Sequence, residues 1–296
     1  MTLKEYQENA SKTIQTYDSK DQQNFFLGYL GLAGEAGSVL TTLKKLIRDG
    51  EGFESFNDKL KEELGDVLWY ITSIAAHYNF DLEDIAKANL FKTQDRFKVK
   101  EFHDLARFDE NYPEKFPDSF CVNFIETDNG NNLREVKMIL EKQNGESVDL
   151  GDPLTDNSRV ANEYRFHDVF HLGHVAFLGW SPVVRHLMEL KRKSDYMTLD
   201  SEDRGRAQVA EEAITLIIYN YAQRNDMLRN SKRIDTELLS MIKQLTLDLE
   251  ISSVTGYIWE QAIIQSYIIF HEVVKNKGGR VLVSPKNRKL EYLGKN

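Results

Sequence analysis

The segment Lys61–Tyr70, which reads KEELGDVLWY, sets three carboxylates among apolar side chains. Glu63 and Asp66 are three positions apart, so they share one face if the segment is helical. The apolar residues around them recur with the 3.6-residue period of an α-helix. They are Leu64, Val67, Leu68, Ile71, Ile74 and Ala75. The pattern predicts a helix over 56–78 whose acidic residues lie near a packed interface.

A second long helix is predicted directly upstream, over 22–49. Ser19 or Asp21 opens it, and Gly50 and Gly52 end it. Glycine recurs along this helix at every third position, although each glycine costs ~1 kcal/mol relative to alanine in a helix interior. The four positions are Gly28, Gly31, Gly34 and Gly37. Such a stripe indicates the close approach of another backbone or of a ligand, and we favour tight helix packing.

Two further helices complete the N-terminal region. Apolar residues at steps of three and four predict one of them over 3–17. Asp81 is the predicted N-cap of the other, and the acidic Glu83 and Asp84 follow in its first turn. This last helix is predicted to continue to about Lys98.

The sequence changes in character near Phe108. The region 108–157 contains three of the five prolines and strand-like runs at 120–125 and 136–140. The tail 280–293 is typical of a hairpin, which we expect to join these strands in one sheet. Helical patterns return in the five segments 162–178, 182–195, 203–224, 233–249 and 251–277. The predicted fold class is mostly α, with a small β insert between two helical bundles and a C-terminal β hairpin.

The composition of the chain limits its function classes. The 296 residues include 38 Lys and Arg against 47 Asp and Glu, and the net charge of −9 disfavours general nucleic-acid binding. A single cysteine, Cys121, excludes an internal disulfide and a multi-cysteine zinc site. The N-terminus lacks the apolar core of a signal peptide, and every apolar run is far shorter than the ~18 residues of a membrane span. We therefore expect a cytoplasmic protein without membrane contact.

Four carboxylates are the main candidates for chemistry: Glu35 on the helix 22–49, and Glu62, Glu63 and Asp66 on the helix 56–78. Clustered carboxylates repel one another and resist desolvation, so a buried group of them needs a compensating cation. Carboxylate oxygens suit Mg²⁺, with Mn²⁺ as an alternative. A solvated acidic helix face is the competing interpretation, which the apolar surroundings disfavour.

Several motifs follow one another over residues 20–98. They are GLAGEAGSVL at 31–40, Lys44-Lys45, KEELGDVLWY at 61–70 and ANLFK at 88–92. In this order and spacing they resemble the MazG nucleotide pyrophosphohydrolase family, which pairs Glu-x-x-Glu on one helix with Glu-x-x-Asp on another. Glu63 and Asp66 match the second pair. The first pair is matched at Glu35 alone, because Ser38 occupies its other position.

The resemblance implies a four-helix bundle, over 1–105, that binds Mg²⁺ through Glu35, Glu63 and Asp66. Glu62 is then a further ligand or a base. The implied reaction hydrolyses NTP or dNTP between the α- and β-phosphates and gives the monophosphate and pyrophosphate. In such a site the metal neutralises the polyphosphate and polarises the attacking water, and a carboxylate accepts the proton of that water. The resemblance also implies a homodimer. Completion of the first bundle by the second bundle of the same chain is the alternative.

Basic and amide side chains near these motifs are candidate substrate contacts. By resemblance, Asn89 and Lys92 contribute to the nucleotide or phosphate site. Lys44 and Lys45 have the charge to pair with phosphate oxygens, and Arg96 is a further candidate. For each basic residue, an ordinary exposed helix charge is the competing interpretation.

Ser38 leaves three interpretations of the site open, because a neutral hydroxyl is a poor substitute for a carboxylate at a divalent cation. In the first, the remaining acids still support catalysis, with one metal fewer. In the second, the chain binds nucleotide without turning it over, as a catalytically impaired sensor or regulatory protein. In the third, the acid was replaced on purpose to trap a substrate complex.

The second half of the chain carries its own motifs: GDPLTDN at 151–157, RFHDVFH at 165–171, LGWSP at 178–182 and KRKSD at 191–195. These resemble the C-terminal domain that accompanies some MazG-type proteins. We therefore divide the chain into 1–105 and a C-terminal domain, 106–296. That domain comprises the β insert 108–157, a helical bundle over 158–278 and a β tail over 279–296.

A second candidate site lies in this C-terminal domain. Its residues are His167, Asp168, His171 and His174 on one predicted helix, and Glu211 and Glu212 on a later one. Offsets of four and seven place the three histidines on one helix face. Histidines and an acid from another helix are suited to Zn²⁺ or Mn²⁺. A polar layer in which the histidines bond the acids, without a metal, is the competing interpretation and the one we favour.

A basic segment follows on the helix predicted over 182–195. Arg185, Lys191, Arg192 and Lys193 are candidates for phosphate binding. A solvated basic helix end is the alternative.

Overall fold

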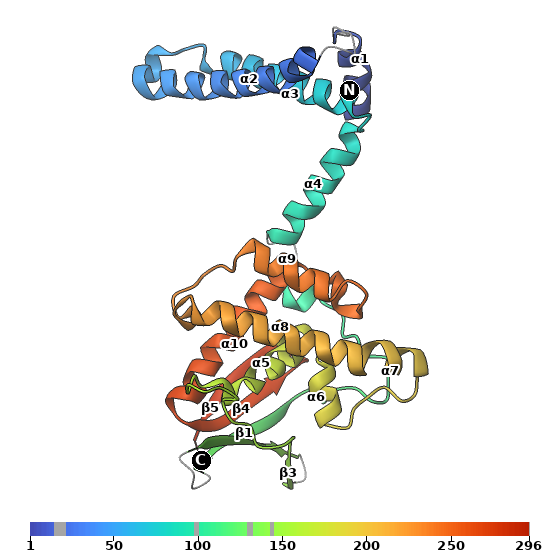
Figure 1. The fold of residues 1–296 in the computed structure, drawn as a ribbon, viewed down its shortest axis with the longest axis vertical. Coiled ribbons are helices and arrows are strands. Elements are labelled where there is room, and N and C mark those ends of the chain that lie inside the picture. Colours follow the sequence, from blue (N-terminus) through green and yellow to red (C-terminus); the bar gives the residue numbers. More distant parts are fainter. Residues whose placement is uncertain (15–21, 98–100, 129–132, 143–144, 296) are drawn as a thin grey trace. The chain divides into compact units, whose positions relative to one another are not determined.

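The computed structural model describes residues 1–14, 22–97, 101–128, 133–142 and 145–295. The chain divides into two compact units, Met1–Thr93 and Gln94–Asn296. Among the described residues, the first unit contains helices and no strands, whereas the second combines helices with a small sheet (Figure 1). The protein is therefore mostly helical, with one antiparallel sheet in its C-terminal part.

The first unit contains α1 (Leu3–Ser11), α2 (Gln22–Asp49), α3 (Phe56–His77) and most of α4 (Leu82–Arg96). α1 is shorter than the helix predicted over 3–17, and residues 15–17 lie outside the described residues, as do the proposed caps Ser19 and Asp21. Asp81 caps α4 as predicted, because its carboxylate accepts the backbone N–H of Glu83 at 2.6 Å.

α2 and α3 pack side by side (Figure 1). The contact is closest at Gly31, where an added Cβ atom would lie 2.0 Å from the ring of Tyr70 and would force that ring to move. A Cβ on Gly28 would lie 3.5 Å from Ile74, whereas Gly34 and Gly37 face no heavy atom within 4 Å in the described chain. Half of the glycine stripe therefore serves helix packing.

α1 packs against α3, and the indole N–H of Trp69 donates to the hydroxyl of Thr13 at 2.8 Å. These contacts account for three helices of the first unit. The complete four-helix bundle remains a prediction.

The second unit is organised on a five-stranded antiparallel sheet with the order β3-β2-β1-β4-β5. The strands are β1 (Phe120–Asp128), β2 (Arg134–Glu141), β3 (Ser147–Asp149), β4 (Gly278–Ser284) and β5 (Lys289–Gly294). Cys121 lies opposite Glu141 on one side and opposite Leu282 on the other. The C-terminal hairpin therefore completes a sheet with the insert strands, as predicted.

The helices of this unit enclose the main core of the protein, and the last of them and a π-helical turn contact the sheet. The helical elements are α5 (Asp168–Gly173), a π-helical turn (His174–Leu178), α6 (Pro182–Leu187), α7 (Tyr196–Glu202), α8 (Gly205–Gln223), α9 (Thr236–Leu245) and α10 (Gly256–Lys275). α5 lies against α10 so closely that a Cβ on Gly173 would lie 1.9 Å from the hydroxyl oxygen of Ser266. None of the described helices is both long and apolar enough to cross a membrane.

The segment predicted as one helix over 182–195 is helical only as far as Leu187, where α6 ends. The next helix, α7, begins after this segment. Arg192 turns inward, and both its backbone N–H (2.6 Å) and its guanidinium (2.7 Å) donate to Asp203. Arg185 is equally buried and donates to Asp109 at 2.8 Å. Phosphate binding and a solvated basic helix end are therefore both wrong for these two arginines, which form buried ion pairs.

Candidate functional site

Three carboxylates from α2 and α3 meet in the first unit. Glu35, Glu63 and Asp66 each offer one oxygen, and the three oxygens lie within 4.8 Å of one another. Glu63 and Asp66 share one face of α3 because they are three residues apart. Packing of α2 against α3 adds Glu35 from the neighbouring helix. We call these three residues the acid cluster.

The acid cluster is partly exposed, with Glu35 and Glu63 half-buried and Asp66 at the surface. Lys59, which pairs with Glu62, also interacts with the charges of Glu63 and Asp66, which help to raise its pKa. In the part of the chain that the structure describes, no Lys, Arg or His forms an ion pair with any member of the acid cluster. Burial raises the pKa of the Tyr6 phenol, and the negative charge of Asp66 raises it further. Three hard oxygen donors from two helices, with no ion-paired cation among the described side chains, fit Mg²⁺ or Mn²⁺.

Glu62 is not among the acids whose oxygens meet in the acid cluster. Its side chain is 60% exposed and forms an ion pair with Lys59 at 2.6 Å. The hydrogen bond from Lys59 to Glu62 raises the pKa of that lysine. The structure therefore does not bring Glu62 together with the other three acids, although it is next to Glu63 in the sequence.

Ser38 follows Glu35 by one helical turn on α2 and is half-buried. Because residues three apart are neighbours on a helix surface, Ser38 shares a face of α2 with Glu35. The cluster therefore has three carboxylates and a neutral neighbour where the family motif has four acids.

The candidate substrate residues differ in their surroundings. Lys44, Lys45, Asn89 and Lys92 are exposed, and no hydrogen bond or ion pair links them to the acid cluster within the described chain. Arg96 belongs to the second unit, where it donates to Glu260 at 2.8 Å and to the carbonyl of Ile234 at 3.0 Å. This guanidinium has a structural role, because Glu260 is fully buried and needs a cation.

A second polar group is buried in the C-terminal unit around Glu211. Its carboxylate accepts four hydrogen bonds, from His171 Nδ1 at 2.8 Å, His174 Nδ1 at 3.0 Å, the hydroxyl of Ser181 at 2.7 Å and the backbone N–H of Val183 at 2.9 Å. Burial opposes ionisation of Glu211, but these partners lower its pKa to about 2. This is the polar layer that the sequence allows, in which the histidines bond an acid.

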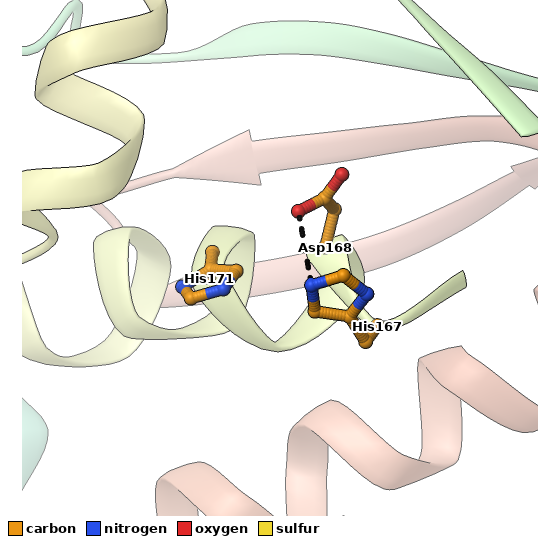
Figure 2. A group of neighbouring side chains, drawn as sticks. All are labelled: His167, Asp168 and His171. Atoms are coloured by element: carbon orange, nitrogen blue, oxygen red, sulfur yellow. Dashed lines mark ion pairs between the residues drawn. The ribbon is translucent and has the colours of Figure 1, made fainter. Parts of the chain in front are cut away.

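His167 and Asp168 lie next to this layer, at the start of α5 (Figure 2). His167 Nε2 is 3.8 Å from the carboxylate of Asp168, and His171 Nε2 is 3.6 Å from that of Glu212. Burial lowers the pKa of His167 and raises the pKa of Asp168. Tyr164 was not predicted as part of this group, but its ring stacks on His167 with a centroid distance of 4.2 Å. No sequence signal identifies this contact, because it depends on a short 3₁₀ turn before α5.

The architecture defines a class of protein in which a helical unit with a two-helix acid cluster is joined to a larger α+β unit. Sequence comparison identifies this class. The family described as the MazG C-terminal domain matches residues 103–296, and the MazG nucleotide pyrophosphohydrolase domain matches residues 28–99. The chain belongs to the MazG family, whose pyrophosphohydrolases generally depend on divalent metals.

A curated relative is similar to part of the N-terminal region. The Gene 37 protein of Mycobacterium phage L5 is 39% identical over 69 residues, which is 23% of this chain. The match spans 60% of the length of that relative. No solved structure matches the chain.

Proposed function

We propose that this protein is a Mg²⁺-dependent pyrophosphohydrolase that cleaves NTP or dNTP to the monophosphate and pyrophosphate. The observation that carries the proposal is the acid cluster: three carboxylates from α2 and α3 with oxygens within 4.8 Å and no cationic side chain paired to them among the described residues. It lies inside the matched MazG nucleotide pyrophosphohydrolase domain.

In the proposed mechanism the acid cluster holds the metal, with Mn²⁺ as an alternative to Mg²⁺. When bound, the metal neutralises the polyphosphate and polarises the attacking water. A carboxylate oxygen of the cluster accepts the proton of that water. The water oxygen bonds to the α-phosphorus, the bond from that phosphorus to the bridging oxygen breaks, and pyrophosphate leaves. The exposed residues Lys44, Lys45, Asn89 and Lys92 are the proposed contacts to the nucleotide and its phosphates.

We also propose that the first unit functions as a homodimer. Leu40, Leu43 and Ile47 follow one stripe of α2 at spacings of three and four, and their exposed fractions are 67%, 45% and 77%. Leu64 and Ile71 add exposed apolar surface on α3. A contiguous apolar surface of this kind is covered in stable proteins, and a second copy of the same helices would complete a four-helix bundle.

Ser38 supports one alternative function. If three carboxylates do not hold the metal tightly enough for catalysis, the chain binds nucleotide without turnover and acts as a sensor or regulatory protein. The two functions differ in product release, because a sensor is stabilised by nucleotide yet releases no pyrophosphate.

The position of bond cleavage tests the proposal. A panel of NTPs and dNTPs is incubated with and without Mg²⁺, and pyrophosphate and orthophosphate are measured separately. We expect Mg²⁺-dependent pyrophosphate and, in water labelled with heavy oxygen, label in the monophosphate. Release of orthophosphate, or label in pyrophosphate, would rule out this reaction. Nucleotide-induced thermal stabilisation without any product would favour the sensor.

A further inference from the structure

We propose that the C-terminal unit contains a second metal site, which binds one divalent transition-metal ion such as Zn²⁺ or Mn²⁺ at the start of α5. Its ligands are His167, Asp168 and His171, with Glu212 of α8 beside them. We call these four residues the histidine site. It lies in a different unit from the acid cluster and does not depend on the proposed hydrolysis.

The geometry brings the ligand atoms together. His167, Asp168 and His171 each offer one ligand atom, and these atoms lie within 4.8 Å of one another (Figure 2). A single ion with metal–ligand distances near 2 Å joins donor atoms at such separations after small side-chain adjustments. Glu212 Oε2 lies 3.6 Å from His171 Nε2 and approaches from the neighbouring helix.

A buried polar atom at this position has no hydrogen-bond partner. His171 is 1% exposed, and its Nε2 atom is unpartnered. The carboxylate of Asp168 lies nearby, with a side chain that is 10% exposed and His167 Nε2 at 3.8 Å. Buried polar atoms are almost always satisfied, and a cation held by Asp168 and the two histidines would satisfy His171 Nε2.

The surrounding residues orient both imidazoles toward such an ion. His171 Nδ1 lies 2.8 Å from Glu211, and His167 Nδ1 lies 2.9 Å from the carbonyl of Tyr164. When a neutral imidazole donates its Nδ1–H to the acceptor, the lone pair is on Nε2. Histidine ligands of metals typically have this arrangement, in which a carboxylate or a backbone carbonyl fixes the ring. Burial opposes the charged form of His171, but Glu211 and Glu212 raise its pKa, so an ion would displace a proton from Nε2.

The neighbouring group of His171, His174 and Glu211 also has metal-compatible spacing. Its carboxylate, however, already accepts four hydrogen bonds, so it needs no cation. We therefore assign Glu211 to the support of His171 and place the ion on the other side of that ring.

The donor set also indicates the kind of ion. Imidazole nitrogens favour Zn²⁺ and other transition metals, whereas Mg²⁺ prefers oxygen ligands and keeps several waters. Entry from solvent is available beside Glu212, whose side chain is 49% exposed. The acid cluster offers oxygens alone, so the two sites are expected to differ in their metal preference.

Metal titration of the full chain tests the histidine site. The Glu63→Gln variant is used throughout, so that the acid cluster contributes little. After chelation and dialysis, Zn²⁺ and Mn²⁺ are titrated in the presence of excess Mg²⁺, with calorimetry and elemental analysis as readouts. We expect one ion per chain, and Co²⁺ bound in place of Zn²⁺ should give visible d–d absorption.

Near-isosteric variants separate a metal site from a structural polar layer. Asp168→Asn and Glu212→Gln should each weaken Zn²⁺ binding by at least about tenfold. Asp200→Asn changes an exposed carboxylate on α7 and should leave the Zn²⁺ affinity unchanged. Glu212 is half-exposed, so this variant remains informative if a change at a buried ligand prevents folding. Absence of a stoichiometric ion, or unchanged Zn²⁺ affinity in both Asp168→Asn and Glu212→Gln, would overturn the proposal.

Discussion

Ser38 is the residue on which the activity of the acid cluster depends most. It follows Glu35 by one helical turn and occupies a position where the family motif has an acid. We predict that Ser38→Glu raises the affinity of the cluster for Mg²⁺ by roughly tenfold, the change produced by ~1.4 kcal/mol of added binding free energy. Pyrophosphate release as a function of Mg²⁺ concentration measures the effect.

Ser38→Gln is the control, because glutamine has nearly the same size and shape as glutamate but carries no charge. Equal behaviour of the glutamate and glutamine variants would mean that position 38 does not face the metal.

Gly31 and Gly34 provide a matched pair on α2. A Cβ at Gly31 would overlap the ring of Tyr70, whereas one at Gly34 meets no described atom within 4 Å. We predict that Gly31→Ala destabilises the first unit by ~1–3 kcal/mol, as overpacking does. Gly34→Ala should instead stabilise it by up to ~1 kcal/mol through helix propensity. Urea unfolding of both variants checks the difference, and destabilisation of similar size at both positions would contradict the α2–α3 packing.

Residue spacing predicted the acid cluster only in part. The three-residue step between Glu63 and Asp66 and their apolar surroundings were readable from the sequence. The pairing of Glu62 with Lys59 was not, because both side chains are exposed and the spacing alone does not select this partner. The structural role of Arg96 was equally hidden, because its partner Glu260 is 164 residues away.

At the scale of elements, the end of α6 is set locally, and buried ion pairs hold the segment that follows it. α6 ends at Leu187, where Glu189 adopts a left-handed backbone conformation (φ 59°) and the backbone N–H of Leu190 donates to the carbonyl of Arg185 at 2.8 Å. Arg192 then lies between Asp203 and Glu250, with guanidinium contacts of 2.7 and 2.8 Å. Periodicity predicts amphipathic helices such as α2, α3 and α8, but it does not anticipate a left-handed cap formed without glycine or asparagine.

We predict that Asp203→Asn destabilises the protein by about 3–5 kcal/mol, because it leaves Arg192 with less compensation in a buried position. Asp248→Asn is the matched control. Its carboxylate pairs with Arg206 on the surface, with side chains 65% and 78% exposed, and such pairs contribute less than about 1 kcal/mol. Chemical denaturation compares the free energies of unfolding of the two variants. Equal losses of stability would contradict a larger contribution from the buried ion pair.

The sheet was the tertiary feature that the sequence predicted best. Strand-like runs at 120–125 and 136–140 and the C-terminal hairpin form one sheet, with β1 between β2 and β4. The short strand β3 and the helix α7 were not predicted, since three and seven residues carry too little periodicity.

At the scale of the whole molecule, the two units differ in how they bury apolar surface. The large hydrophobic core belongs to the C-terminal unit, whereas α2 exposes Leu40, Leu43 and Ile47. We predict that the protein is a dimer in solution and that Leu40→Lys with Ile47→Lys shifts it toward the monomer. Analytical ultracentrifugation over a concentration series measures the shift.

Val209→Lys on α8 is the control for this experiment, because Val209 is a similarly exposed apolar residue, at 68%, in the other unit. It should leave the dimer intact. A wild-type monomer at all concentrations, or equal dissociation by both sets of substitutions, would contradict the assignment of the α2 stripe as the interface.

The most direct test of the central claim compares Glu63→Gln with Glu62→Gln. The two residues are adjacent on α3, but Glu63 belongs to the acid cluster and Glu62 is paired with Lys59. In the Mg²⁺-dependent pyrophosphate assay, we predict that Glu63→Gln lowers kcat/KM by at least about a hundredfold, as loss of ~2.7 kcal/mol of transition-state stabilisation would. Glu62→Gln should remain within about threefold of the wild type. Equal loss in both variants, or full activity of Glu63→Gln, would contradict the assignment of the acid cluster as the metal and catalytic site.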